Sequence, residues 1–244
     1  NRRFGIGADG LLAIKNAHIA DFEMEYYNSD GSTGMLCGNG ARCIIKYADS
    51  SGRIKNSYTK FVFQSSFYSG EVKSAELITF NLNSPTEIEE EIEIRVLDQL
   101  FSASFINTGA HHVIIDLEEQ KFSDEKLKDI ETFPVEKYGR EIRYSKQFAP
   151  IGTNVNFISC IDEFISIRTY ERGVEQETLA CGTGSVGASI ISGLKQKIET
   201  PVNIKTKSGD LLNIDFDIME KKQIENVKLT GPAKIVFEGK ININ

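Results

Sequence analysis

The sequence has few cysteines, few prolines and no long apolar run. Four cysteines in 244 residues are too few for a secreted domain built on disulfides, so we expect reduced thiols in a cytoplasmic protein. With five prolines and no low-complexity segment, no flexible linker is apparent. No apolar stretch approaches the ~18 residues that cross a bilayer, and we recognise no signal peptide in a chain that starts at Asn1. We therefore expect no membrane partner.

Basic residues are also in deficit. The 28 basic and 35 acidic side chains give a net charge of −7, which repels phosphate backbones and argues against a nucleic-acid partner. The chain has only three histidines and no Cys-x-x-Cys pair, so a zinc site is a poor fit and we expect no metal. The apolar fraction of 40% is that of an ordinary globular protein with a large core.

Strand-like segments outnumber helix-like ones, which predicts an α/β (α+β) fold. Short runs rich in β-branched and aromatic residues predict strands at Phe22–Tyr27, Phe61–Gln64, Leu77–Leu82, His112–Leu117, Val155–Cys160, Ile165–Tyr170, Leu211–Phe216 and Lys234–Phe237. Helices are predicted at Gly40–Ala48, Lys121–Ile130 and Gly184–Lys197.

One short pattern occurs twice. Cys37-Gly38-Asn39-Gly40 and Cys181-Gly182-Thr183-Gly184 lie 144 residues apart, and each precedes a helix-like run. An internal repeat of this kind predicts two related lobes, each offering a cysteine at a helix start. We place the lobe boundary near Leu82–Pro85, where strand-like sequence gives way to an acidic stretch around Glu87–Glu93.

A cysteine at a helix start has a defined chemistry. The first N–H groups of a helix have no partner within the helix, and they lie at the positive end of its dipole. Such a site binds a carboxylate and favours thiolate over thiol. If the two lobes face each other, one thiolate removes a proton and the opposite thiol returns one to the other face, which inverts a carbon that bears a carboxylate.

The remaining two thiols have a plainer interpretation. Cys43 lies six residues after Cys37, on another face of the same helix, and Cys160 lies in an apolar strand. We expect both to be core thiols. A protein in which Cys37 and Cys181 only form a disulfide, without catalysis, is the alternative from another functional class.

Six motifs, in order along nearly the whole chain, resemble diaminopimelate epimerases. They are Phe4-Gly5-Ile6-Gly7-Ala8-Asp9-Gly10-Leu11-Leu12, Tyr27-Asn28-Ser29-Asp30-Gly31-Ser32, Met35-Leu36-Cys37-Gly38-Asn39-Gly40-Ala41-Arg42-Cys43, Gly152-Thr153-Asn154-Val155-Asn156-Phe157, the paired segments Tyr170-Glu171-Arg172-Gly173-Val174 and Glu177-Thr178-Leu179-Ala180-Cys181-Gly182-Thr183-Gly184, and Leu229-Thr230-Gly231-Pro232-Ala233. The cysteine block at residues 35–43 is the most specific.

The resemblance implies a fold and a reaction. The fold is a pair of pseudo-symmetric lobes, each a curled mixed β-sheet around a central helix, with the active site in the cleft between them. The lobes are expected at residues 1–82 with 233–244, and at 83–232. The reaction is the interconversion of LL- and meso-diaminopimelate, in lysine and peptidoglycan precursor biosynthesis, without pyridoxal phosphate or another cofactor. The sequence leaves the oligomeric state open, a homodimer included.

The same resemblance implies roles for individual residues of this chain. Cys37 and Cys181 become the two catalytic cysteines, assisted by Glu171 and His112. The reacting carboxylate is expected on the N–H groups of Gly38, Asn39, Gly182 and Thr183, and the far end of the substrate on Asn28, Asn154 and Arg172, with Glu171 also in contact.

The chain departs from the family in three places. The family's opening strand, with its Gly-Asn-Asp-Phe segment, has no counterpart before Phe4. The Gly-Asn-Pro-His segment is Gly109-Ala110-His111-His112, so an ungapped match selects His112 and a match shifted by one selects His111. Gly10 stands where some members carry a substrate-contacting Gln. A proline racemase-like enzyme is the nearer alternative, against which Asn39 and the Glu171-Arg172 pair argue.

Overall fold

The computed structural model describes residues 6–161 and 164–240, which form fourteen strands, three α-helices and four short 3-10 helices. The first part of the chain contributes β1 (Gly10–Lys15), β2 (Phe22–Asn28), α1 (Gly38–Ser50), β3 (Tyr58–Phe63), β4 (Ser66–Val72) and β5 (Leu77–Asn81). The last part contributes β9 (Asn154–Ile161), β10 (Phe164–Glu171), β11 (Gln176–Thr178), α3 (Gly182–Leu194), β12 (Val202–Lys205), β13 (Leu211–Ile218) and β14 (Ile224–Pro232).

These two parts repeat one topology. In each, an antiparallel hairpin leads to a helix, and the next strand returns parallel to the hairpin's second strand: β2 beside β3 around α1, and β10 beside β12 around α3. Two further antiparallel strands complete each unit. We call β1–β5 with α1 the first repeat, and β9–β14 with α3 the second repeat. This repetition agrees with the two related lobes expected from the Cys-Gly-x-Gly turns.

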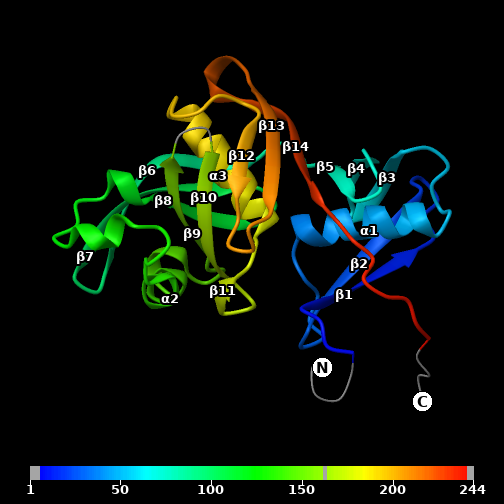
Figure 1. Cartoon of the computed structure of the whole chain (residues 1–244), viewed down its shortest axis with the longest axis horizontal. Coiled ribbons are helices and arrows are strands. Elements are labelled where there is room, and N and C mark those ends of the chain that lie inside the picture. Colours follow the sequence, from blue (N-terminus) through cyan, green and yellow to red (C-terminus); the bar gives the residue numbers. More distant parts are fainter. Residues whose placement is uncertain (1–5, 162–163, 241–244) are drawn as a thin grey trace.

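The last strands of the two repeats join them. β5 and β14 pair antiparallel, with Thr79 opposite Thr230 and their hydroxyl oxygens 2.8 Å apart. Because equivalent strands pair antiparallel, the two repeats are related as by a two-fold axis. The fold is therefore mixed and pseudo-symmetric, as expected, but the strands form one continuous sheet through both halves, as Figure 1 shows with β14 between α1 and α3.

Three strands and a helix lie between the first and second repeats. Three strands, β6 (Thr86–Val96), β7 (Gln99–Asn107) and β8 (His111–Asp116), extend the sheet beyond β9, and α2 (Val135–Arg143) packs near β9 and β10. Their core is aromatic, with Phe133 4.5 Å from Phe157 and Phe101 5.3 Å from Tyr138 between ring centroids. A larger core surrounds α1 and α3 and includes residues of both repeats.

The two cysteine helices differ in how they are covered. Only six of the thirteen residues of α1 are buried, because one face meets solvent. All thirteen residues of α3 are buried, and its glycines and serines let strands approach closely. A Cβ at Gly187 would lie 2.9 Å from Ile106, and one at Gly193 3.0 Å from Phe216. The small residues of α3 are thus a condition of its complete burial.

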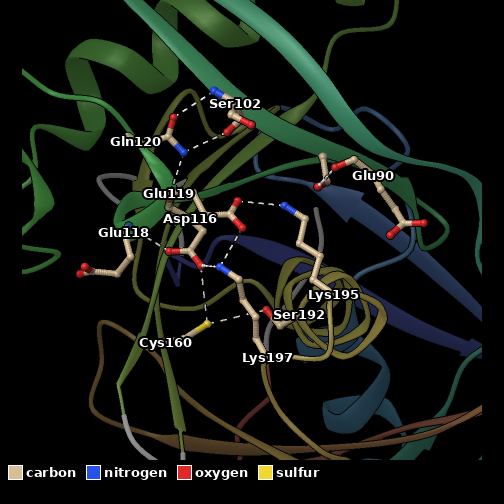
Figure 2. A network of polar contacts seen from close by, with 11 residues as sticks. Glu90, Ser102, Asp116, Glu118, Glu119, Gln120, Cys160, Ser192, Lys195 and Lys197 are labelled. Carbon is tan, nitrogen blue, oxygen red and sulfur yellow. Dashed lines mark hydrogen bonds and ion pairs between the residues drawn. The ribbon is translucent and has the colours of Figure 1, made fainter.

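The C-terminal end of α3 is held by charges (Figure 2). Lys197 contacts Asp116 at 2.5 Å and Glu119 at 2.8 Å, and Lys195 contacts Glu119 at 2.9 Å. Gln120 ties the same turn to β7, since its amide bonds both the N–H and the carbonyl of Ser102 at 2.9 Å. These contacts fix the axis of the helix whose other end carries Cys181.

Most predicted elements are confirmed. Strands form at or across Phe22–Tyr27, Phe61–Phe63, Leu77–Asn81, His112–Asp116, Val155–Cys160, Ile165–Tyr170 and Leu211–Phe216, and helices at Gly40–Ala48 and Gly184–Leu194. The division into lobes at residues 82/83 and 232/233 stays a prediction.

The helix predicted at Lys121–Ile130 is wrong. Only a 3-10 turn forms, at Glu125–Lys128. The Asp124 carboxylate accepts a hydrogen bond from the Lys126 N–H at 3.1 Å, and Asp129 accepts one from Glu131 at 3.0 Å. Such local bonds from side chain to backbone favour turns over helix. The helix of this region is α2, which begins after Pro134.

One further expectation needs correction. The strand predicted at Lys234–Phe237 is irregular, and Val236 is 84% exposed, because the pairing with β5 stops at Pro232 and leaves the segment without a partner strand among the described residues. The acidic stretch at Glu87–Glu93 belongs to the edge strand β6, in which isoleucines are interspersed among glutamates. Charged side chains on such an edge discourage pairing with another chain.

Candidate active site

Cys37 and Cys181 occupy the same position in the two repeats. Each is the residue that caps the start of its helix, with nearly identical backbone angles: φ −118° and ψ 114° at Cys37, φ −118° and ψ 107° at Cys181. The carbonyls of both cysteines accept the first hydrogen bonds of their helices, from Ala41 at 2.8 Å and from Ser185 at 2.9 Å. The N–H groups just after each cysteine therefore lie at a helix start, as the repeated turn predicts.

The two helix starts meet. A Cβ at Gly38 would lie 3.2 Å from the Cα of Gly182, and one at Gly182 would lie 3.1 Å from the Cα of Gly38. Leu229, on β14, lies against both glycines, 2.7 and 3.0 Å from these positions. Asn39 crosses from one helix start to the other, since its amide donates to the Ala180 carbonyl at 2.9 Å. Only glycine permits this approach, and it brings the two cysteine turns face to face.

The sulfurs have different neighbours. Cys37 Sγ accepts a hydrogen bond from the Gly40 N–H at 3.4 Å, within its own helix turn. Cys181 Sγ lies 3.7 Å from the Thr183 hydroxyl. Cys37 is half-buried, whereas Cys181 is buried. All four cysteines are unpaired thiols.

Both thiols are weakly acidic, which corrects the expectation that a helix start favours thiolate, because burial outweighs the effect of the helix start. Burial, and then the negative charge of Glu171, raise the pKa of Cys37 to about 11. The same two causes raise the pKa of Cys181, and the Gly184 N–H offsets part of the effect. Burial also raises the pKa of Glu171 itself, which accepts a hydrogen bond from the Thr178 hydroxyl at 2.9 Å. One carboxylate thus acts electrostatically on both sulfurs.

His112 lies beside the start of α3. It is fully buried, and its Nε2 is 3.0 Å from the Thr183 hydroxyl oxygen. Burial, and then the charge of Arg172, lower the pKa of His112 to about 3, so its ring is neutral at ordinary pH. His111 instead turns its ring edge-on to Phe105, 5.3 Å between centroids. Of the two histidines that the sequence leaves open, His112 is the one joined to a helix start.

Asn154 and Arg172 form a second group. The Asn154 amide donates to the His111 carbonyl at 2.9 Å and accepts from the Arg172 backbone N–H at 2.9 Å. The Arg172 guanidinium donates to the carbonyl of Ile151 at 3.0 Å and contacts Met35 of the first repeat. The side-chain amide of Asn28 donates instead to the Ser32 hydroxyl in its own turn, at 3.0 Å. The structure thus joins Asn154 to Arg172 and does not join Asn28 to either.

Tyr26 is a neighbour of the site that the sequence did not suggest. Burial, and then the charges of Cys37 and Glu171, raise the pKa of Tyr26 to about 12. Its ring fills the space beside two glycines: a Cβ at Gly34 would lie 2.1 Å from Tyr26, and one at Gly10 would lie 2.4 Å from it. The ring therefore occupies the place that a side chain at position 10 needs.

Cys43 and Cys160 lie outside this arrangement. Cys43 is exposed, so the expectation of a core thiol is wrong for it, because α1 turns that face to solvent. Cys160 packs partly buried against the core, 3.8 Å from the Ser192 hydroxyl and 3.9 Å from Asp116. Within residues 6–161 and 164–240, no group of three His, Cys, Asp or Glu side chains is placed to hold a metal ion.

The comparison with family models gives one match. The model described as diaminopimelate epimerase matches residues 1–82 and 104–236. Among curated proteins, the diaminopimelate epimerase of Aquifex aeolicus (strain VF5) is 40% identical over 243 residues, with 98% of this chain and 81% of that protein covered. The diaminopimelate epimerase of Chlorobaculum tepidum is 36% identical, with 99% and 88% covered.

Solved structures share the fold at low sequence identity. A probable proline racemase from Agrobacterium radiobacter K84, with bound carbonate, is similar with a TM-score of 0.66 at 13% identity, covering 94% of this chain and 76% of that one. A Bacillus anthracis phenazine biosynthesis protein of the PhzF family is similar with a TM-score of 0.64 at 13% identity, covering 94% of this chain and 84% of that one.

None of the helices formed by the described residues is long and apolar enough to cross a bilayer.

Proposed function

The chain belongs to the diaminopimelate epimerase family, and we propose that it interconverts LL- and meso-diaminopimelate with Cys37 and Cys181 as its two acid–base groups. The observation that carries the assignment of the cysteines is the meeting of the two helix starts at Gly38 and Gly182, which brings the two cysteine turns together. Family membership favours this reaction over that of a proline racemase-like enzyme and over a thiol protein without catalysis.

The reaction is a pair of proton transfers at one carbon. The thiolate of one cysteine takes the α-proton, and the thiol of the other gives its proton to the opposite face, so the configuration inverts and the two sulfurs exchange protonation states. Each cysteine is base for one stereoisomer and acid for the other. No electron leaves the system, and proton exchange with water restores the starting state.

The carbanion between these steps needs electrostatic help. The N–H groups of Gly38, Asn39, Gly182 and Thr183 lie at the two helix starts, where they can take up the charge that grows on the reacting carboxylate. Because these groups are fixed before the substrate arrives, no reorganisation is needed during the reaction.

Glu171 links substrate binding to thiol ionisation. Its charge opposes a thiolate at either cysteine. A substrate brings an α-ammonium group, and placing that cation beside Glu171 offsets the repulsion. We therefore assign Glu171 to the α-ammonium, so that a thiolate forms when substrate is bound. His112, neutral and fully buried, acts by hydrogen bonding to Thr183 and not by titration.

The far end of the substrate is assigned to Asn28, Asn154 and Arg172. Arg172 is suited to a paired grip on a carboxylate. Its guanidinium donates to two backbone carbonyls, those of Ile151 and Gly152, at 3.0 and 3.3 Å, so a carboxylate would compete with these for its N–H groups. Asn28 contributes from the first repeat once the substrate spans the two halves.

The cellular setting follows from the reaction. We propose a cytoplasmic enzyme of lysine and peptidoglycan precursor biosynthesis that works without pyridoxal phosphate, with lobes at 1–82 plus 233–244 and at 83–232. The low cysteine content, four in 244 residues, supports a reducing compartment. A homodimer stays a prediction.

Isotope exchange tests this function directly. We expect the protein, incubated with LL-diaminopimelate in D2O, to form the meso isomer and to place deuterium at the α-carbon that changes configuration. Proline, as the competing substrate, should acquire no deuterium. Absence of α-deuterium in diaminopimelate would remove the epimerase assignment, and exchange into proline alone would favour the racemase alternative.

A further inference from the structure

Asn156 is a buried amide beside the start of the second cysteine helix. Its side chain is fully buried in β9, two residues beyond Asn154 on the same strand. Its Oδ1 accepts a hydrogen bond from the Thr169 hydroxyl at 3.0 Å, and its Nδ2 donates to the Val113 carbonyl at 2.9 Å. The same Nδ2 lies 3.2 Å from His112 Nδ1. Every polar atom of this amide is therefore engaged.

These partners fix which way the amide points. The Val113 carbonyl can only accept, so the group facing it must be the NH2. The second hydrogen of that NH2 then points to His112 Nδ1, which must accept it. An imidazole that accepts at Nδ1 and is neutral carries its proton on Nε2. The low pKa of His112 agrees with a neutral ring.

The order of hydrogen-bond donation continues from His112 to the sulfur of Cys181. His112 Nε2–H faces the Thr183 hydroxyl oxygen at 3.0 Å and donates to it. A hydroxyl that accepts one hydrogen bond still has its own hydrogen to give, and Cys181 Sγ lies 3.7 Å away, within reach for a bond to sulfur. The order of donation is thus Asn156 to His112 to Thr183 to Cys181.

We propose that Asn156 is a positioning residue for the epimerase reaction: by fixing the His112 tautomer, it makes the Thr183 hydroxyl donate to Cys181 and so stabilises the thiolate there. The proposal rests on the proposed function for its meaning in catalysis, but the hydrogen-bond order stands without it. We call Asn156, His112 and Thr183 the Cys181 relay.

Two observations indicate that the Cys181 relay is specific to Cys181. A Cβ at Gly184 would lie 2.2 Å from Asn156 Oδ1, so glycine at the third position of α3 leaves the room that the amide occupies. The first repeat has no equivalent, because Asn39, which matches Thr183, turns its side chain toward Ala180 and Arg42 and not toward Cys37. The relay is therefore a property of one cysteine and not of the repeated turn.

Asn156→Asp reverses the relay with little change in shape. A carboxylate cannot donate, so His112 is expected to move its proton to Nδ1, and Nε2 then accepts from the Thr183 hydroxyl in place of Cys181. The ¹⁵N spectrum of the His112 ring should report a proton on Nε2 in the parent protein and on Nδ1 in the variant. A parent spectrum with the proton on Nδ1 overturns the proposal without any variant.

Thiol reactivity gives the second readout. With methyl methanethiosulfonate as probe and mass spectrometry of the two cysteine peptides, the pH midpoint of Cys181 modification should rise by about one unit in Asn156→Asp, a roughly tenfold slower reaction below the midpoint. Cys37 should be unchanged. Asn81→Asp, the same substitution on β5 in the first repeat, is the matched control and should alter neither midpoint.

The carboxylate introduced by Asn156→Asp also raises the Cys181 pKa directly by its negative charge. Variants at Thr183 separate this effect of charge from the effect of the reversed hydrogen bonds. Glu171 and Cys37 are the groups whose charges raise the pKa of Cys181, and neither is altered. If the relay operates, Thr183→Val raises the Cys181 midpoint, Thr183→Ser restores it, and Asn156→Asp adds nothing in the Thr183→Val background. An equal shift in both backgrounds means charge alone and overturns the proposal. None of these readouts requires turnover, so they are independent of the deuterium assay that tests the proposed function.

Discussion

The two cysteine turns have the same backbone and different surroundings. Cys37 and Cys181 cap their helices with φ of −118° in both cases, yet α1 exposes one face and α3 exposes none. The sulfur of Cys37 is held by a backbone N–H of its own turn, while that of Cys181 lies against a hydroxyl tied to His112. A repeated turn thus fixes where two thiols stand, and the elements packed around each turn decide how each thiol ionises.

Removing one cysteine at a time should have the largest effect. Cys37→Ser and Cys181→Ser each replace a thiol with a hydroxyl that hardly ionises near neutral pH, so epimerisation should fall by about 10²–10⁴-fold. Elimination from a substrate analogue with a leaving group on the β-carbon needs only one proton transfer. Each variant should keep this reaction with the isomer whose α-proton faces its remaining cysteine. Equal loss with both isomers in both variants would falsify the two-base assignment.

Formation of a disulfide between Cys37 and Cys181 tests whether the two thiols lie close together. A mild oxidant should form a Cys37–Cys181 disulfide, provided that the Cα atoms come within about 7 Å, with two hydrogens passing to the oxidant. Activity should fall in step with the disulfide measured by mass spectrometry and return with a reductant. The Cys43→Ser variant, which removes the exposed thiol, is the control and should behave as the parent does. Full activity in the oxidised protein would rule the pairing out.

Separating the two helix starts should have an intermediate effect. Gly38→Ala places a methyl group 2.7 Å from Leu229 and 3.2 Å from Gly182, and Gly182→Ala places one 3.0 Å from Leu229. Overpacking of this kind costs about 1–3 kcal/mol, and displacement of the N–H groups should lower kcat by about 10–100-fold. Gly38→Ala should be the more severe, measured by urea unfolding and by kcat. Gly239→Ala, which meets no atom within 4 Å, is the control.

The buried histidine of β8 should affect the pH dependence of stability. The folded-state pKa of His112 is about 3, below the unfolded value of 6.5, so the unfolded state binds the extra proton between these limits. Stability should therefore be lost as the pH falls from 6.5 toward 3, with a contribution of about 1.4 kcal/mol per pH unit. His112→Asn should reduce this slope in urea titrations at pH 4–7. An unchanged slope would mean that His112 is not a buried neutral base.

Much of this arrangement could be anticipated from the residues. The Cys-Gly-x-Gly repeat predicted two helix starts and two related halves, and the order of six motifs identified the family. Tyr26 and Asn156 were missed for different reasons. Asn156 had a signal, because residues i and i+2 of a strand share a face and Asn154 was already a candidate. Tyr26 had none, since its place near Cys37 depends on β1 packing beside α1 and on β2 pairing with β1, with Gly10 and Gly34 leaving room for the ring.

The predictions of local structure that proved wrong have a similar cause, because each depends on packing between distant segments. Lys121–Ile130 has helical composition, but Asp124 and Asp129 cap local turns, and the competition between these bonds and a helix is decided by nearby packing. Lys234–Phe237 has strand composition but finds no partner strand among the described residues, and strand pairing is not a local property. Cys43 was expected to be a core thiol on another face of the Cys37 helix, whereas α1 is covered on one side only.

The sequence by itself determined the chemistry that each half offers: a thiol, two glycines and a helix start are local features, set by a few adjacent residues and by backbone geometry. Only the tertiary structure decided how those features combine. The contact of Gly38 with Gly182, the pairing of β5 with β14 and the burial of His112 against Thr183 join residues 71 to 151 positions apart. Such contacts depend on the packing of whole elements, and that packing, more than the repeated motif, makes the two cysteines unequal.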